Sequence, residues 1–185
     1  GIRIRGVSLP YVVTIANNII SNSFNGVCVK DGDNLAGATI LVTNNSLVDN
    51  SNAGIYHGGT GTLSAERNWF GNATGPAYSN NPGGRGDAVK GTGAVDFSPW
   101  LGDGTDTQSA VVGFQPAADA GVFYLPVSLA FTQQPGGAAL GEVLNPQPTV
   151  TVYDEIGQIA TQFVGTVTLT LEDKPGSGTL GGTAA

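Results

Sequence analysis

Two stretches of similar sequence decide the fold of this chain: "VTIANNIISNSFNGVCV" at residues 13–29 and "ILVTNNSLVDNSNAGIYH" at residues 40–57. In each stretch a run of aliphatic residues leads into an Asn-Asn pair, and a later glycine is followed by another aliphatic residue. The alignment pairs Ile15 with Val42, Asn17-Asn18 with Asn44-Asn45, Ile20 with Leu47 and, after one inserted residue, Gly26-Val27 with Gly54-Ile55.

Two weaker copies of this unit flank the pair. At the beginning of the sequence, Gly1-Ile2 matches the glycine-aliphatic step of the longer units. Further along, "LSAERNWF" at residues 63–70 places an alanine, an asparagine and a phenylalanine at the positions of Val42, Asn45 and Leu47. Equivalent residues of successive units are therefore separated by 23 to 28 residues.

The alternation within each unit predicts short β-strands whose aliphatic side chains face one way. Val13 and Ile15 lie two residues apart, as do Ile40 and Val42. A single strand of this kind cannot bury its apolar face, so successive units are expected to stack with one unit per coil. An α-helix is excluded, because the apolar residues do not recur at the i, i+3, i+4 spacing of an amphipathic helix.

The composition agrees with an all-β fold that is rich in tight turns. Charged residues make up 11 % of the chain, compared with about 25 % in an average globular protein. Glycine accounts for 29 of the 185 residues, and both glycine and asparagine tolerate the left-handed backbone that turns require. A charge-poor chain rich in glycine, threonine and asparagine is also typical of bacterial cell-surface proteins.

The charge balance and the apolar runs argue against two kinds of partner. The formal net charge is −7, and no run of basic residues occurs. Nucleic acid is therefore not expected as a partner, because its binding depends on a basic surface. No stretch of about 18 apolar residues is present, so no membrane-spanning segment is expected either. Cys28 is the only cysteine, and we expect it to be a small buried residue.

The two Asn-rich units resemble those of the pectate-lyase-like superfamily, in the version with short Asn-rich repeats found in bacterial surface and secreted proteins. The stretches "RNWFG", "GDAV" and "VDFSPWL" are similar to the closing segment of such proteins. The resemblance implies that residues 1–101 are the last coils of a right-handed parallel β-helix and its closing segment. Because Gly1 already lies on a repeat strand, we expect that earlier coils have been removed. The last coil of such a stack needs a cover, for which we expect Trp69, Phe70, Phe97 and Trp100.

The remainder of the chain divides into a linker and a second all-β part. Residues 102–127 show no sustained period, apart from a short strand expected in 121–127. Within 128–185, strands are expected at 128–132, 148–153 and 164–171.

The stretch "LAFTQQPGGAALGEVLNPQPTVTVYDEIGQ", followed by "GTVTLTL" and "GTL", resembles a bacterial Ig-like repeat of surface proteins. The resemblance implies an incomplete Ig-like β-sandwich over 128–185, because a full one needs about 100 residues. Truncation is the favoured explanation, and completion by strands of another chain is the alternative.

His57, in "GIYHGGTG", is the only histidine and was considered as a catalytic residue. Some β-helix polysaccharide hydrolases have a catalytic His-Gly pair, which this stretch resembles. Those enzymes also need clustered carboxylates as acid and base, and no such cluster occurs in the sequence. We therefore expect His57 to be structural, pointing inward with Ile55 or lying at the corner of a coil.

Asp31 and Asp33, in "KDGDNLAG", are the best candidates for calcium ligands. Their spacing matches the beginning of an oxygen-ligand loop, but the glycine and the closing glutamate of an EF-hand are missing. A turn at a coil corner is the favoured interpretation, and calcium remains the alternative. Asp103 and Asp106 are interpreted in the same way.

Several short motifs carry weaker functional interpretations. Arg85-Gly86-Asp87 is an integrin-type tripeptide, but three residues recur by chance. Asn44 and Asn72 stand in glycosylation sequons, which matter only in a host that glycosylates. A sugar-stacking face would need several aromatic residues, whereas scattered aromatic residues are more often packed in a core. The candidates for such a face are Tyr11, Tyr56, Tyr78 and Trp69.

Taken together, the sequence predicts a non-catalytic structural or adhesin-like fragment of a bacterial extracellular or cell-surface protein. Self-association into filaments through open β edges is expected, with other protein chains or polysaccharide as further partners and no cofactor. Two alternatives remain: the end of a polysaccharide lyase or hydrolase, and a carbohydrate-binding module.

Overall fold

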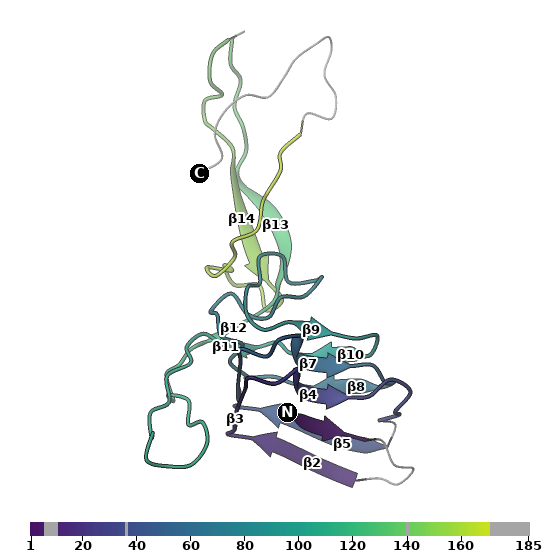
Figure 1. Ribbon diagram of the computed structural model, residues 1–185. Helices are drawn as coiled ribbons and strands as arrows, with labels where there is room; N and C mark the ends of the chain where they lie inside the picture. Colours follow the sequence, from purple (N-terminus) through teal and green to yellow (C-terminus); the bar gives the residue numbers. More distant parts are fainter. Residues whose placement is uncertain (6–10, 36, 140, 171–185) are drawn as a thin grey trace.

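The computed structural model describes residues 1–5, 11–35, 37–139 and 141–170 (Figure 1). These residues form fourteen strands joined by turns, and no helix is found among them. The described part of the chain thus contains no helix that is long and apolar enough to cross a membrane. Three groups of parallel strands stack in one body, and an antiparallel pair projects from it (Figure 1).

The first parallel group is a four-stranded sheet in the order β1-β4-β7-β9. Its register aligns Ile2 with Val27 and Val27 with Ile55. Val89 continues the same column on β9. The strands of this sheet are β1 (Ile2–Ile4), β4 (Asn25–Val29), β7 (Ala53–His57) and β9 (Val89–Lys90).

The second parallel group has the order β10-β8-β5-β2. Ile15 lies opposite Val42, and Leu63 lies opposite Val95. The strands of this sheet are β2 (Tyr11–Ala16), β5 (Ala38–Thr43), β8 (Thr62–Ser64) and β10 (Ala94–Asp96).

The third parallel group pairs β3 (Ile19–Ser21) with β6 (Ser46–Val48). It aligns Ile20 with Leu47, and an isolated parallel bridge from Ser46 to Trp69 extends the group to the next unit. The proposed pairings of Ile15 with Val42, Ile20 with Leu47 and Val27 with Ile55 are thereby confirmed, as is the match of Ile2 to Val27.

The inward positions of the three groups form one apolar column. Val27, Val42 and Leu47 are fully buried, each on a different group. Burial of one such side chain contributes about 1.5–3 kcal/mol relative to exposure. Each successive unit adds further buried aliphatic side chains to the column. The all-β class is confirmed, and the parallel stacking is compatible with a β-helix-like fold.

The bends between the strands explain the Asn pairs of the repeats. Asn17 and Asn44 have φ of 59° and 53°, and Arg67 occupies the equivalent bend of the next unit with φ of 58°. Asparagine visits this left-handed region more readily than most residues, because its short polar side chain can hydrogen-bond locally. The first asparagine of each pair therefore turns the chain, which leaves the second to point inward.

The second asparagines form a ladder beside the apolar column. Asn45 Oδ1 accepts a hydrogen bond from the Asn18 backbone N at 2.9 Å, and Asn68 Oδ1 accepts one from the Asn45 backbone N at 3.0 Å. Asn45 Nδ2 also donates to the Ile15 carbonyl at 2.8 Å. Asn45 and Asn68 are fully buried, so the ladder pairs polar groups that would otherwise be buried without partners.

After the parallel strands, the chain forms two small antiparallel sheets. The first pairs β11 (Trp100–Leu101) with β12 (Val122–Phe123), and the second pairs β13 (Pro126–Gln133) with β14 (Thr149–Asp154). The strands expected at 128–132 and 148–153 are confirmed as β13 and β14. The strand expected in 121–127 corresponds to β12 and to the first residues of β13.

The third strand expected in this part, at 164–171, is wrong for residues 164–170, which are not in a strand, and Leu171 lies outside the described residues. The chain does return alongside β14, because Ala160 N donates to the Val152 carbonyl. It then turns, with Phe163 N donating to the Ala160 carbonyl. The alternation of Val and Leu with Thr is present, but no neighbouring described backbone pairs with it.

Candidate functional site

The aromatic residues expected as a cover fall into two environments. Phe70, Phe97 and Trp100 belong to the buried core, whereas Trp69 is half-buried on the other side of its strand. The Phe97 ring centroid lies 5.5 Å from that of Tyr78, in an edge-to-face arrangement, and 6.1 Å from that of Trp100. Such contacts stabilise aromatic pairs beyond the area they bury, so this cluster is a packing feature of the stack.

Trp100 fixes the glycine-rich loop 71–86 against the aromatic cluster. Its Nε1 donates a hydrogen bond to the Ala73 carbonyl at 2.9 Å. Gly75, with φ of 77°, passes so close that a Cβ atom there would lie 2.5 Å from the indole ring. Glycine is required at this point because it combines the left-handed backbone with the close approach.

The aspartate of Arg85-Gly86-Asp87 has a structural role. Asp87 Oδ2 accepts hydrogen bonds from the backbone N and the Nδ2 of Asn50, at 2.8 and 2.9 Å. Asn50 Oδ1 in turn accepts one from the Ser23 backbone N at 3.2 Å. A second polar ladder therefore runs through Ser23, Asn50 and Asp87, and it engages the carboxylate on which adhesion through this tripeptide would depend.

His57 points inward on β7 and is fully buried. Its Nε2 lies 3.0 Å from the Gly61 carbonyl, and its Nδ1 accepts a hydrogen bond from the Gly59 N at 3.3 Å. Because a carbonyl only accepts, the proton belongs on Nε2. A Cβ atom on Gly93 would lie 2.4 Å from the ring, so the backbone closes over the imidazole. Both nitrogens are thus engaged by backbone groups, and no described carboxylate hydrogen-bonds the imidazole.

The two calcium candidates lie in the turn that follows β4. Asp31 Oδ1 accepts a hydrogen bond from the Tyr56 hydroxyl at 2.8 Å, and this bond raises the pKa of Tyr56 above its ordinary value of 10.0. Asp33 Oδ2 is buried without a hydrogen-bond partner among the described residues. In the described ranges no three His, Cys, Asp or Glu side chains form a group that could hold a metal ion, and two carboxylates fall short of the six to eight oxygens that calcium takes.

The other aspartate pair also serves local turns. Asp103 Oδ1 accepts a hydrogen bond from the Thr105 N at 3.1 Å, and Asp106 Oδ1 accepts one from the Gln108 N at 3.1 Å. Both are Asx-type contacts, in which the side chain bonds the backbone two residues later. The geometry agrees with the interpretation of this segment as a series of turns.

The proposed aromatic face is not assembled into one surface. Tyr11 and Tyr78 pack against the core from different elements, and Tyr56 lies on the outer face of the first sheet. The sequons also differ: Asn44 Oδ1 is buried without a partner among the described residues, whereas Asn72 Oδ1 accepts bonds from the N and Oγ1 of Thr74.

Comparisons with protein-family models, with curated proteins and with solved structures found no match for this chain. The geometry of its surface is therefore the basis for any functional conclusion.

One surface was missed by the sequence reasoning: the outer face of the β1-β4-β7-β9 sheet. The register places Arg3, Cys28, Tyr56 and Lys90 in one row across the four strands. The expectation that Cys28 is buried is wrong, because Val27 and Val29 take the inward positions and Cys28 is half-exposed.

Two further cations extend this row. Arg5 and Lys30 each lie two residues beyond a member of the row and are exposed, as are Arg3 and Lys90. Neighbouring strands lie about 4.8 Å apart, so the row spans about 14 Å. We call Arg3, Arg5, Lys30 and Lys90 the basic face. The repeat alignment contained the signal for Arg3 beside Cys28 and for Cys28 beside Tyr56. It contained none for Lys90, which lies outside the aligned units.

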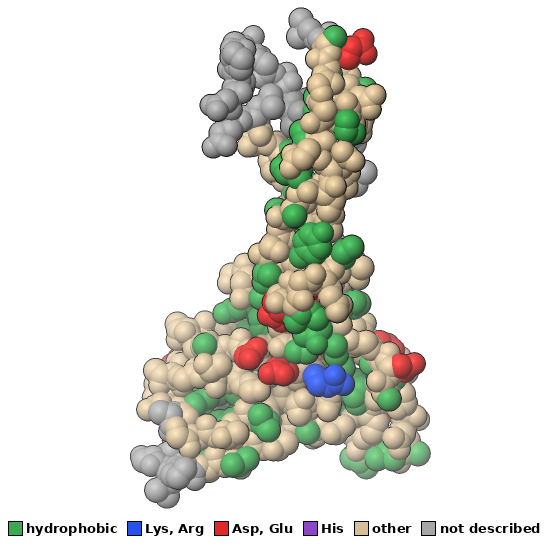
Figure 2. Space-filling model, turned by 180° about the vertical axis from the view of Figure 1, so that it is seen from behind, with side chains coloured by type: hydrophobic (Ala, Val, Ile, Leu, Met, Phe, Trp, Pro, Cys, Tyr) green, Lys and Arg blue, Asp and Glu red, His purple; other side chains and the backbone are tan. Residues whose placement is uncertain are grey.

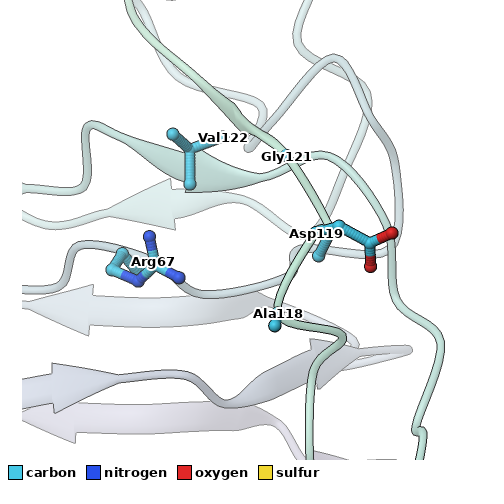
Figure 3. Close-up of a pocket in the computed structure, with 6 residues that line it drawn as sticks. Arg67, Ala118, Asp119, Gly121 and Val122 are labelled. Atoms are coloured by element: carbon cyan, nitrogen blue, oxygen red, sulfur yellow. The ribbon is translucent and has the colours of Figure 1, made fainter.

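A shallow cavity of about 190 Å³ lies elsewhere, between Arg67 and residues 118–122 (Figure 3). Figure 3 shows the Asp119 carboxylate directed away from Arg67, and the cavity wall is largely backbone and small side chains. It contains no pair of groups suited to acid–base catalysis.

Proposed function

We propose that this chain is a non-catalytic structural module of an extracellular or bacterial cell-surface protein, with display and contact as its role. The three parallel groups are interpreted as coils of a right-handed parallel β-helix, with the aromatic cluster as its cover. The β13–β14 pair is interpreted as the beginning of an Ig-like module. These finer assignments rest on the sequence resemblance and on the compatible geometry.

One observation carries this proposal: His57 and Asp87, which the sequence suggested for catalysis and for adhesion, are instead bonded within the stack. His57 has both ring nitrogens bonded to the backbone of its own corner. Asn45 and Asp87 each pair polar groups of neighbouring coils. These side-chain hydrogen bonds between neighbouring units make the stack rigid. Rigidity is what a module that displays other parts of a protein needs.

Self-association through open strand edges is part of the proposal. Within the described residues, β1, β2 and β3 each pair with another strand on one side only. Open parallel edges can accept a further strand. Val13 faces inward on β2 but is only half-buried, whereas Val12 faces outward and is 74 % exposed.

Light scattering combined with electron microscopy on the purified chain tests this assembly. We expect oligomers or filaments for the wild type and for Val12→Lys, and smaller species for Val13→Lys, because an inward charge at an open edge blocks strand pairing. Circular dichroism establishes that both variants fold. A monomeric wild type across the accessible concentration range would contradict assembly through the edges.

The alternatives are tested by activity and binding. We expect no release of new sugar ends from pectin or other polysaccharides by this chain, since a general acid without its partner carboxylate does not constitute a mechanism. Cleavage of any such polymer that the matched His57→Asn variant lacks would overturn the structural proposal in favour of the hydrolase alternative.

A further inference from the structure

The charges of this chain are divided between its two halves. Residues 1–90 hold six of its seven Lys and Arg side chains, and residues 91–173 hold none. Nine of the fourteen Asp and Glu side chains lie after residue 90. The molecule is therefore close to neutral over the strands up to β9 and strongly acidic beyond them.

The fold gathers cations on one surface, and three of the nine later carboxylates lie together in one segment of the sequence. Four of the six cations of the first half form the basic face on the β1-β4-β7-β9 sheet. Lys90 donates to Asn52 Oδ1 at 3.1 Å, and no ion pair joins the basic face to a described carboxylate. Tyr56 lies within the face and is bonded to Asp31, the one acidic neighbour that the hydrogen bonds place there.

The complementary surface is the segment between β11 and β12, which we call the acidic segment (residues 102–121). It carries Asp103, Asp106 and Asp119 and no basic residue. Its loop is fixed to the first bend of the stack, because Phe114 N donates to the Asn17 carbonyl and Asn17 Nδ2 donates to the Phe114 carbonyl.

The acidic segment keeps its carboxylates available for contacts. Asp103 and Asp106 use Oδ1 for their turns. Asp119 is exposed and points away from Arg67, the nearest labelled cation (Figure 3). Asp103 and Asp119 are exposed and Asp106 is half-buried, and no described hydrogen bond joins any of the three to the basic face.

We propose that the basic face of one copy of this chain binds the acidic segment of a second copy. The two surfaces have opposite charge, and among the described residues no ion pair joins either of them to another part of the chain. Because they are different patches, the contact is heterologous and extends copies into chains or closes them into rings. The contact goes beyond the proposed function, since it uses side chains on a sheet face and no strand edge.

Such a contact depends on salt. Exposed ion pairs are individually weak, but a cluster of them acts through a field that is screened over about 10 Å at 0.1 M salt and about 30 Å at 0.01 M. We therefore expect self-association that is strong near 0.01 M salt and lost by about 0.5 M, where screening is almost complete. Pairing through strand edges, by contrast, persists at high salt, so the two kinds of assembly are distinguishable.

Charge-swap variants, studied by sedimentation velocity at low salt, test the proposal. The triple variant R3E/R5E/K90E makes the basic face acidic. The triple variant D103N/D106N/D119K makes the acidic segment basic while keeping amide oxygens for the two turns. We expect each variant alone to associate at least tenfold more weakly than the wild type, and a mixture of the two to associate again, because each then offers the charge that the other lost.

Control measurements distinguish this contact from a general effect of net charge and from binding of an anionic polymer. Arg85→Glu changes net charge outside both surfaces and should associate like the wild type. Salt-dependent association that survives in either triple variant would overturn the proposal, as would failure of the mixture to associate. A wild type that stays monomeric at low salt but binds polygalacturonate or single-stranded DNA would also overturn it, and would assign the basic face to an anionic polymer.

Discussion

The stacked strands and the β13–β14 pair are built from the same kind of sequence, with apolar and polar residues in alternation. In the stack, the aliphatic side chains meet across three groups of strands and are fully buried. On β13, Leu129 and Phe131 share one face and remain 56 % and 46 % exposed. Figure 2 shows hydrophobic side chains along this projecting part of the molecule.

Alternation of apolar and polar residues therefore predicts a strand, but it does not predict whether other residues will bury the apolar face of that strand. Each unit of the stack has a neighbour with the same pattern 23 to 28 residues away, so like packs on like. β13 has one hydrogen-bonded neighbour, β14, and a two-stranded sheet by itself is marginal in water. The stack should therefore respond to mutation as a cooperative core, and the β13–β14 pair as a local element.

The largest expected effect compares two phenylalanines. Phe70→Ala removes a fully buried ring and should lower the free energy of unfolding by about 3–5 kcal/mol. Phe131→Ala, at a half-exposed ring, should change it by less than about 1 kcal/mol. Denaturant unfolding followed by tryptophan fluorescence measures both, because Trp69 and Trp100 lie in the stack. Equal losses for the two variants would show that the parts unfold as one.

The second prediction compares polar contacts. Asn45→Ala leaves the Asn18 N and the Ile15 carbonyl without their partner, and should cost about 2–4 kcal/mol, since each buried unpaired group costs about 1–3 kcal/mol. The control is Thr132→Val, which removes only exposed contacts of its Oγ1, with the Thr151 Oγ1 at 3.0 Å and with the Thr149 carbonyl at 3.4 Å. The same unfolding curves report both changes. A loss below about 0.5 kcal/mol for Asn45→Ala would mean that the ladder does not stabilise the stack.

The third prediction compares two aspartates that each accept two hydrogen bonds through one carboxylate oxygen. Asp87 bonds Asn50 of a neighbouring unit of the stack, and Asp154 Oδ1 bonds the backbone N of Ile156 and Gln158 within one turn. Asp87→Ala should destabilise the whole stack by about 1–3 kcal/mol, with Asp87→Asn less affected because it retains an acceptor. Asp154→Ala should increase amide exchange only around β14. Exchange that rises throughout the stack in Asp154→Ala would contradict this division.

The smallest expected effect concerns the outer face of the stack. The hydrogen bond to Asp31 raises the pKa of Tyr56, because it favours the protonated phenol. Its contribution to stability is therefore complete below the ordinary value of 10.0 and is lost as pH rises through the folded value. Ultraviolet titration of the wild type against Tyr56→Phe isolates this residue. In Asp31→Asn the midpoint should fall, and an unchanged midpoint would show that the bond has no such effect.

The features of the fold that could be predicted are those that depend on the repeated sequence pattern. The pairing of Ile15 with Val42 and of Ile20 with Leu47 could be predicted, because repeated units stack in the register of their alignment. The absence of a strand at 164–170 could not, because a strand also needs a partner. Cys28 was misassigned because local apolarity does not reveal which face of a strand a residue occupies.

The candidate site residues were also predictable only in part. That His57 points inward could be predicted from its spacing to Ile55, but its closure by Gly93 depends on a segment more than thirty residues later. Asp87 belongs to no Asn pair, so nothing local marks it as the end of the ladder through Asn50.

The sequence by itself determined the repeats, the bends at Asn17 and Asn44, and the inward column, because these follow from periodicity and from the backbone preferences of single residues. The tertiary structure alone decided that Arg3 and Lys90, eighty-seven positions apart, share one face. It also left the apolar face of β13 uncovered. The physical reason is that charge fields and burial depend on distances in space, which local sequence patterns do not contain.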